Sequence, residues 1–387
     1  MRTSTEVLVL GGGPAGLAAG IALRARGVDV TVVDAREPAI DKACGEGLMP
    51  EALAALERLG VHLDDADGMP FLGIRFCDEQ RSAEARFPEG AGMGVRRLRL
   101  HARLVERAEA CGVTLRWNTR CQLAGPGRAL VDDEEMSFRY LVGADGQSST
   151  VRKWAGMAAC RKEHLRYGVR WHYQVEPWSE LVEVHWAECG QAYVTPVAKD
   201  CVCVAFVGGD SHREAGEWLS SFPAIASRVA SAPVVSAQRG AVSATRVLRE
   251  VERGSVALVG DASGSVDAVT GEGMAACFLQ AEALAEAISE RDLEMYSKAH
   301  RRIGRLPQIM ASLLLLMDRF PELEARALET FAARPDLFRD LLAVHVGARG
   351  LPGFALRRGP QFCWKLLTAG GREDWDEDRE PEGDQLK

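Results

Sequence analysis

The chain has 387 residues, of which 47% are hydrophobic and 26% charged, and its formal net charge is −8. This length favours two closely joined domains, and the acidic balance argues against a nucleic-acid partner, which needs a broad basic face. The ten cysteines include no CxxC pair. No secretion signal precedes the first strand, and the longest apolar run (residues 309–317) is about half the length of a membrane span. We therefore expect a cytoplasmic protein without a metal site, and leave a peripheral membrane contact open.

The first motif is a glycine-rich turn between a strand and a helix. Residues 6–36 read EVLVLGGGPAGLAAGIALRARGVDVTVVDAR, the pattern of a strand, a glycine turn, a helix and a second strand. A G-x-G-x-x-G sequence in this setting favours a dinucleotide site over a purely structural turn, and an acidic residue ending the second strand accepts from a ribose hydroxyl. The expected contacts are Gly11, Gly13, Pro14, Ala15, Gly16, Asp34, Ala35 and Arg36.

A second glycine-rich loop, DKACGEGLMP (residues 41–50), follows that strand. Gly45 and Gly47 predict backbone that adopts a positive φ or approaches a flat group closely. Amphipathic helices are expected over residues 50–60 and 98–112, because each pattern ends at a glycine.

The pattern changes between residues 167 and 207. Four short segments rich in β-branched and aromatic residues predict a separate antiparallel sheet. Residues 256–277 then return to a buried strand, a glycine turn and the start of a helix. Residues 292–356 are expected to be mainly helical, with Pro307, Pro321 and Pro335 as helix breakers.

Two further segments carry a resemblance to a known superfamily. YLVGADGQSSTVR (residues 140–152) and VALVGDASGSVDAVTGEGMAAC (residues 256–277) resemble the DG and GD motifs of FAD-dependent oxidoreductases. The similarity is to the geranylgeranyl reductase and aromatic-ring hydroxylase (class A flavin monooxygenase-like) superfamily. Within it, the chain most resembles bacterial members linked with polyketide-type natural products. It implies that Asp261 binds the ribityl chain and that the helix starting near Gly273 lies under the flavin.

The resemblance also assigns the CGEGL loop and several single residues. In geranylgeranyl reductases a similar loop lies against the isoalloxazine, which would place Cys44 beside flavin or substrate; an inert, space-filling cysteine is an equal alternative. Arg97 matches an arginine that reaches the pyrophosphate or ribityl region, with Arg96 and Arg99 as alternatives. The FAD contacts implied by the resemblance are Cys44, Gly45, Arg97, Cys121, Asp145, Gly260, Asp261, Gly271, Gly273 and Met274.

Together these features predict an α/β protein. A Rossmann-like, three-layer FAD-binding domain with a mainly parallel sheet carries an inserted antiparallel substrate domain and C-terminal helices. The expected parts are residues 1–75, 96–160 and 251–300 for the FAD-binding domain, 76–95 for a β excursion, 161–250 for the substrate domain, 301–370 for the helices and 371–387 for a disordered acidic tail.

The reaction is less constrained than the cofactor. Because no second G-x-G-x-x-G lies between a strand and a helix, electrons are expected from transiently bound NADH or NADPH, or from a separate reductase. The lipid-reductase aromatic signature is only partly matched by GQAYVTPV (residues 190–197), so a monooxygenase acting through a flavin C4a-hydroperoxide on a hydrophobic aromatic or polyketide-type substrate is favoured. A reductase of lipid alkenes is the alternative. A halogenase or a non-catalytic flavin-binding protein is less favoured, and the oligomeric state stays open.

Three side chains are candidates for a base that deprotonates a phenol. In RWHYQ (residues 170–174) Arg170 and His172 share one face of the predicted strand. His185 and Tyr193 lie on neighbouring predicted strands. For each of His172, His185 and Tyr193, an ordinary structural role is favoured over catalysis.

Overall fold

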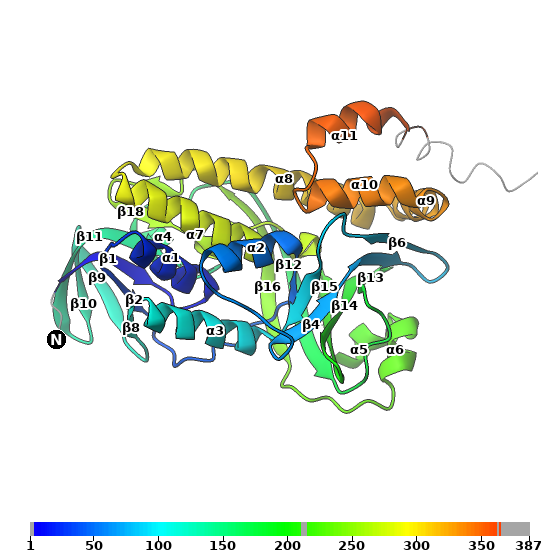
Figure 1. Cartoon of the computed structure of the whole chain (residues 1–387), viewed down its shortest axis with the longest axis horizontal. Coiled ribbons are helices and arrows are strands. Elements are labelled where there is room, and N and C mark those ends of the chain that lie inside the picture. Colours follow the sequence, from blue (N-terminus) through cyan, green and yellow to red (C-terminus); the bar gives the residue numbers. More distant parts are fainter. Residues whose placement is uncertain (1–3, 210–214, 362–363, 365–387) are drawn as a thin grey trace, which may run out of the picture.

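The computed structural model describes residues 4–209, 215–361 and 364, and the acidic tail expected over residues 371–387 lies outside them. Figure 1 shows one large sheet on the left of the molecule and a second from its centre to the right. In the part of the chain that is described, no helix is long and apolar enough to span a bilayer.

The first sheet is the Rossmann-like core. Its strand order is β17-β18-β11-β1-β2-β8, with β10 paired to β11 and β9 paired to β10, and the pairings of β1, β2, β8, β11 and β18 are parallel. Burial on both faces explains why its central strands are continuous apolar runs. The strands are β1 (Ser4–Leu10), β2 (Val30–Val33), β8 (Thr114–Arg116), β9 (Cys121–Gly125), β10 (Arg128–Val131), β11 (Glu134–Gly143), β17 (Glu252–Arg253) and β18 (Val256–Leu258).

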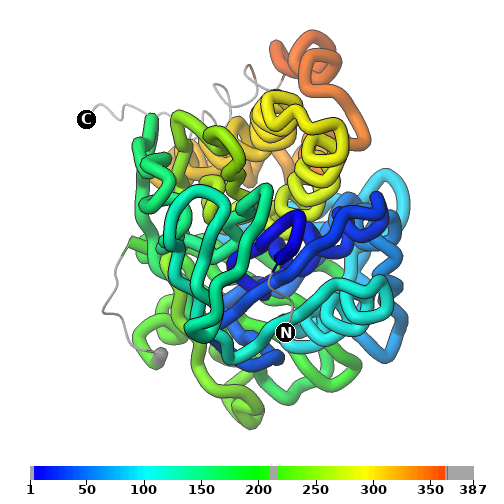
Figure 2. The backbone as a smooth tube through the Cα atoms, turned by 90° about the vertical axis from the view of Figure 1, so that its left-hand side faces the viewer, coloured from blue at the N-terminus to red at the C-terminus, as the bar shows by residue number. Residues whose placement is uncertain are grey.

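Helices from distant parts of the sequence cover this sheet. Helix α1 packs against α3 and α7, and α7 packs against α2 and α8. Figure 2 shows the yellow α7 and α8 beside the blue N-terminal segment. The elements are α1 (Pro14–Ala25), α2 (Pro50–Arg58), α3 (Arg97–Ala110), α4 (Thr150–Trp154), η1 (Gly260–Ser263), η2 (Ala268–Thr270) and α7 (Gly273–Ser289).

The second sheet has the order β16-β12-β15-β14-β13-β5-β6 and is antiparallel except for the pair β13 and β5. Trp171 and Tyr173 pack under α5 (Ala215–Ser220) and α6 (Pro223–Val229), on the face opposite Arg170, as the alternation of side chains predicted. Its strands are β5 (Gly73–Cys77), β6 (Ser82–Arg86), β12 (Cys160–Tyr173), β13 (Val182–Ala187), β14 (Gly190–Ala198), β15 (Cys201–Gly208) and β16 (Arg239–Leu248).

A small sheet and four C-terminal helices complete the fold. The small sheet contains β3 (Gly47–Leu48), β7 (Gly92–Val95) and β4 (Gly68–Phe71), and the helices are α8 (Leu293–Arg319), α9 (Pro321–Ala333), α10 (Pro335–His345) and α11 (Leu351–Arg357). Pro321 and Pro335 each lie at the start of a new helix, as expected of helix breakers. The expectation that Pro307 also breaks a helix is wrong, because Pro307 lies inside α8. Burial of Met310, Ala311 and Met317 in that helix outweighs the missing hydrogen bond.

A buried arginine ties the second sheet to the rest of the molecule. The guanidinium of Arg166, on β12, donates to Asp267 Oδ1 at 3.1 Å and to the carbonyl oxygen of Val207 at 3.0 Å, and it lies 3.5 Å from Asp318 Oδ2 on α8. Asp267 in turn accepts from the backbone N–H of Val269 and so caps η2. One side chain therefore holds β12, η2 and α8 in a fixed arrangement.

We predict that Arg166→Met destabilises the fold by about 3–5 kcal/mol, because it leaves the fully buried carboxylate of Asp267 without its cation. The change is measured from the midpoint and slope of denaturant unfolding. Arg161→Met, at an exposed position of the same strand, is the control and should unfold like the wild type. Equal stability of the two variants would contradict the role given to Arg166.

Candidate functional site

A cavity of about 740 Å³ lies between the two large sheets and is closed at one end by the C-terminal helices. Of the residues expected to bind the cofactor, only Gly16 does not line it. The expected cofactor residues that line the cavity are Gly11, Gly13, Pro14, Ala15, Asp34, Ala35, Arg36, Cys44, Gly45, Arg97, Cys121, Asp145, Gly260, Asp261, Gly271, Gly273 and Met274. Segments far apart in the sequence therefore converge on one space.

The glycine loop combines tight packing with one open position. A Cβ at Gly16 would lie 1.8 Å from the carbonyl oxygen of Gly11, so the third glycine lets α1 approach β1. At Gly13, among the described residues, no heavy atom lies within 4 Å of the position of a Cβ. Gly12, which the motif leaves free, packs against Trp117, whose ring would be 2.3 Å from a Cβ. The open position at Gly13 is where a phosphate can approach the backbone.

Asp34 lies at the cavity wall and organises the loop around it. Its Oδ2 accepts from the backbone N–H of Gly12 at 2.8 Å, and its Oδ1 accepts from the backbone N–H of Arg36 at 2.9 Å. Each carboxylate oxygen can accept more than one hydrogen bond, so both contacts leave capacity for a ribose hydroxyl. The carboxylate thus shapes the loop as well as facing the cavity.

Asp145 lines the cavity, and its carboxylate is also held by the protein itself. Its carboxylate accepts from the hydroxyls of Ser149 and Thr150 and from the backbone N–H groups of Thr150 and Val151. These contacts cap the short helix α4. Asp145 lines the cavity, but its charged group is engaged by the protein.

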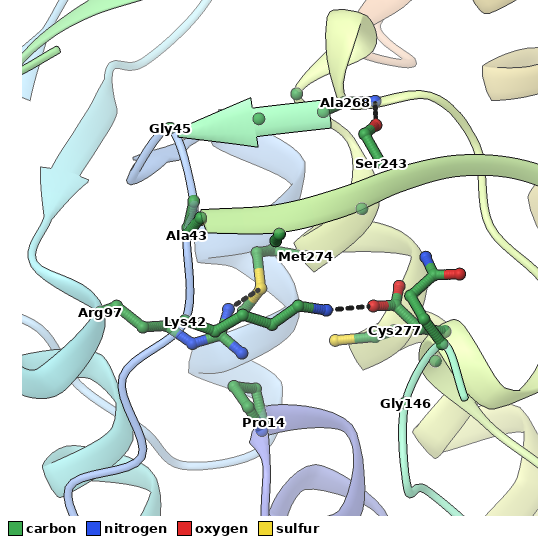
Figure 3. A pocket seen from close by; sticks show the side chains of 18 of the residues that line it. Pro14, Lys42, Ala43, Gly45, Arg97, Gly146, Ser243, Ala268, Met274 and Cys277 are labelled. Atoms are coloured by element: carbon green, nitrogen blue, oxygen red, sulfur yellow. Dashed lines mark hydrogen bonds and ion pairs between the residues drawn. The ribbon is translucent and has the colours of Figure 1, made fainter. Parts of the chain in front are cut away.

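Two cations reach into the cavity. The ammonium of Lys42 donates to Asp261 Oδ2 at 2.7 Å, and Lys42 crosses the cavity between Pro14 and Met274 (Figure 3). Arg97 extends beside it with Nη1 3.5 Å from Met274 Sδ, while its buried Nε has no hydrogen-bond partner among the described residues. The centre of the cavity thus offers positive charge and an unsatisfied donor to an anionic group.

The CGEGL loop turns at Glu46. Of the two alternatives expected for Gly45 and Gly47, the positive φ lies instead at Glu46, which adopts φ +61° and donates its backbone N–H to Cys44 Sγ at 3.4 Å. The glutamate tolerates this conformation because its carboxylate is held elsewhere, as described below. Gly45 has open space at its Cβ position, as expected for backbone that a flat ring could approach.

The carboxylate of Glu46 connects three parts of the fold. Oε1 accepts from the backbone N–H of Arg97 at 2.9 Å, and Oε2 lies 2.6 Å from His172 Nε2. Arg170 Nη1 lies 3.1 Å from His172 Nδ1, and a guanidinium can only donate, so Nδ1 accepts and Nε2 donates to Glu46. Both ring nitrogens of His172 are therefore engaged, and His172 does not line the cavity.

Near this pair, Glu46, His172 and Cys203 bring a carboxylate, an imidazole and a thiol within 4.8 Å of one another. Burial, followed by the charge of Glu46, raises the pKa of the Cys203 thiol well above its usual range. Arg170 already supplies a positive charge 3.7 Å from Glu46. A protonated thiol beside a guanidinium does not suit a bound cation.

The other two candidate bases have opposite positions. His185 faces away from the cavity, with Nε2 3.1 Å from Glu183 Oε2, whereas its neighbours Val182 and Val184 line the cavity. The expectation that His185 faces the flavin or substrate is wrong, because the strand alternation turns it to the other face of β13. Tyr193 lines the cavity, and burial raises the pKa of its phenol, which excludes it as a base near neutral pH.

The far end of the cavity is apolar. Its lining includes Ile74 and Phe76 of β5, Leu314 of α8 and Phe338 of α10. Phe76 and Phe338 pack with their ring centroids 4.9 Å apart. The cavity therefore joins a charged, glycine-lined part to a hydrophobic part.

A Rossmann-like sheet with this cavity defines the class of dinucleotide-dependent oxidoreductases. The chain belongs to the FAD binding domain family, whose sequence pattern matches residues 4–291. The structure is similar to that of a flavoprotein/dehydrogenase from Cytophaga hutchinsonii, with a TM-score of 0.78 and 17% identity over 96% of this chain and 100% of that one. At this identity the likeness concerns the fold.

Two curated relatives are similar over part of the chain. Menaquinone reductase of Mycobacterium tuberculosis is 30% identical over 190 residues, 45% of this chain and 47% of the relative. The putative FAD-dependent monooxygenase YetM of Bacillus subtilis is 31% identical over 186 residues, 44% of this chain and 50% of the relative. The chain thus spans about half the length of these relatives.

The residues present fit FAD. The open Cβ position at Gly13 and the first turn of α1 suit the pyrophosphate, and the orphaned Nε of Arg97 points to a missing acceptor. Asp261 would accept hydrogen bonds from the ribityl hydroxyls. The Lys42 ammonium, which donates to the same carboxylate, would compete with these hydroxyls for it. Gly271, Gly273 and Met274 line the cavity at the N-terminus of α7, which stabilises negative charge.

We predict that Gly13→Ala weakens FAD binding on the order of tenfold or more, about 1.4 kcal/mol, without changing the stability of the flavin-free protein. The new methyl group would occupy space open to the cofactor and lie more than 4 Å from every other side chain or backbone segment that the structure describes, apart from its chain neighbours. Binding is measured by flavin fluorescence quenching.

Gly12→Ala is the matched variant. It should cost about 1–3 kcal/mol of stability in the flavin-free protein, because its methyl group would clash with Trp117. If Gly13→Ala instead destabilised the flavin-free protein and bound FAD normally, the assignment of the phosphate position would be incorrect.

Proposed function

We propose that the protein is an FAD-dependent monooxygenase that hydroxylates a hydrophobic aromatic or polyketide-type substrate. The observation that carries the proposal is the continuity of the cofactor end of the cavity with an apolar end between the second sheet and α8 and α10. An apolar pocket of this kind suits a ring with an alkyl tail and keeps water from the reacting atoms. The relative YetM, named as a putative monooxygenase, supports the same reaction class.

Bound FAD would supply the activation of oxygen, with electrons from transiently bound NADH or NADPH or from a separate reductase. The protein's own side chains would bind the cofactor and the apolar substrate. Ile74, Phe76, Leu314 and Phe338 would enclose the substrate. Gly45 would leave room for a flat ring to lie against the CGEGL loop.

A reductase of alkenes in a hydrophobic substrate is the second candidate. The cavity side of the second sheet presents no histidine free to deprotonate a phenol, since His172 is engaged with Glu46 and His185 faces away. Alkene reduction needs a hydride and a proton and no such base. The relative named menaquinone reductase also favours this chemistry.

We predict that the flavin, reduced without oxygen and then mixed with it, shows a transient absorbing species, and that an oxygen atom enters an alkyl-phenol substrate. A closed, apolar pocket protects such a species from water. Rapid-mixing absorbance and mass spectrometry with isotopic oxygen measure the two results. Saturation of an alkenyl chain by the reduced protein in the absence of oxygen, with no oxygen atom incorporated, would reject hydroxylation in favour of the reductase.

A further inference from the structure

A second buried pair of titratable groups lies beside the cavity, at the N-terminus of α7. Glu272 precedes α7 and is 5% exposed, and His345 ends α10 and is 6% exposed. Glu272 Oε2 lies 3.8 Å from His345 Nδ1, and among the described residues neither atom has a hydrogen-bond partner. Buried polar atoms are rarely left unpaired, so two that face each other require an explanation.

The hydrogen bonds of His345 fix which of its nitrogens carries the proton. His345 Nε2 lies 2.9 Å from the carbonyl oxygen of Thr270, and a carbonyl oxygen only accepts. Nε2 therefore donates, and in the neutral ring Nδ1 presents a lone pair toward Glu272. Burial lowers the pKa of His345 to about 4, which keeps the ring neutral.

Glu272 has the complementary property. Burial, followed by the charge of Glu51 on α2, raises the pKa of its carboxyl to about 8. Burial also raises the pKa of Glu51, against the opposing charge of Arg58. A protonated Glu272 carboxyl and the lone pair of His345 Nδ1 are matched as donor and acceptor.

The position of the pair connects it to the redox chemistry. Thr270, Gly273 and His345 line the cavity, so the pair lies against the wall where the N-terminus of α7 would face the flavin. Reduction of a flavin by hydride adds two electrons and one proton and leaves one negative charge on the ring. A negative charge placed near Glu272 disfavours its ionised form.

We propose that Glu272 is a proton-binding site coupled to the redox state of the bound flavin, with His345 as its hydrogen-bond acceptor. The proposal rests on the proposed FAD-dependent function and adds the uptake of one proton by the protein when the flavin is reduced. Where Glu272 is ionised beside the oxidised flavin, hydride passes from a reduced nicotinamide to the flavin, the nicotinamide leaves oxidised, and one proton from solvent binds the Glu272 carboxylate. The stored proton compensates the new negative charge and is released when the flavin is reoxidised.

The test is a redox titration of the FAD-loaded protein at a series of pH values, without substrate. Above about pH 8, where Glu272 is ionised with oxidised flavin, the wild type should bind two protons per two electrons. The reduction equilibrium then changes a hundredfold per pH unit, about 60 mV in midpoint potential. The Glu272→Gln variant should bind one proton per two electrons. Its reduction equilibrium should then change tenfold per pH unit, about 30 mV in midpoint potential.

Two further variants locate the proton. His345→Gln keeps a donor to the Thr270 carbonyl and an acceptor for Glu272, so it should retain the wild-type dependence. Glu286→Gln, at an exposed position of the same helix, should also retain it. An unchanged pH dependence in Glu272→Gln, or its loss in His345→Gln alone, would overturn the proposal. Failure to hydroxylate substrate would instead count only against the proposed reaction, because the titration contains no substrate.

Discussion

The arrangement of the site depends on the buried carboxylate of Glu46. One side chain accepts from the first residue of α3, pairs with His172 on β12 and lies 3.7 Å from Arg170. Its left-handed backbone conformation costs roughly 1–2 kcal/mol, which these contacts offset. The loop, the cofactor domain and the second sheet thereby share a single anchor. The cavity exists because these three parts are held at a fixed separation.

Burial then determines what the cavity can do chemically. Its cofactor end has glycine backbone, Lys42, Arg97 and the N-terminus of α7, all of which attract negative charge. Its other end has aliphatic and aromatic side chains that exclude water. Between them the acid Glu272 keeps its proton and His345 stays neutral because both are desolvated. A polar cofactor and an apolar substrate can thus meet in one space with a nearby supply of protons.

The sequence predicted those features that follow from local spacing. The glycine turn and the opposite faces of Arg170 and Trp171 depend on the periods of strands and helices, and the structure has both. The assignment of Asp261 came from the resemblance to FAD-dependent oxidoreductases, and Asp261 lines the cavity. The position of Gly16 away from the cavity agrees with its expected packing role.

The sequence did not predict features that depend on long-range partners. Glu46 meets His172 across 126 residues, and Lys42 meets Asp261 across 219. His345 gives no local signal in the sequence, because it is a single histidine at the end of a C-terminal helix. His185 was misplaced because choosing the inward face of β13 requires knowing what packs on each side. Pro307 continues a helix because tertiary burial outweighs a local rule.

The central claim is that this cavity holds one FAD. It is tested most directly by denaturing the purified protein, after incubation with excess FAD and removal of the free cofactor, and identifying the released flavin by chromatography. The account predicts one FAD per chain, and strongly reduced occupancy in Asp261→Ala, which removes the carboxylate expected to hold the ribityl hydroxyls. A protein that releases no flavin, or an Asp261→Ala variant that retains full occupancy, would contradict it.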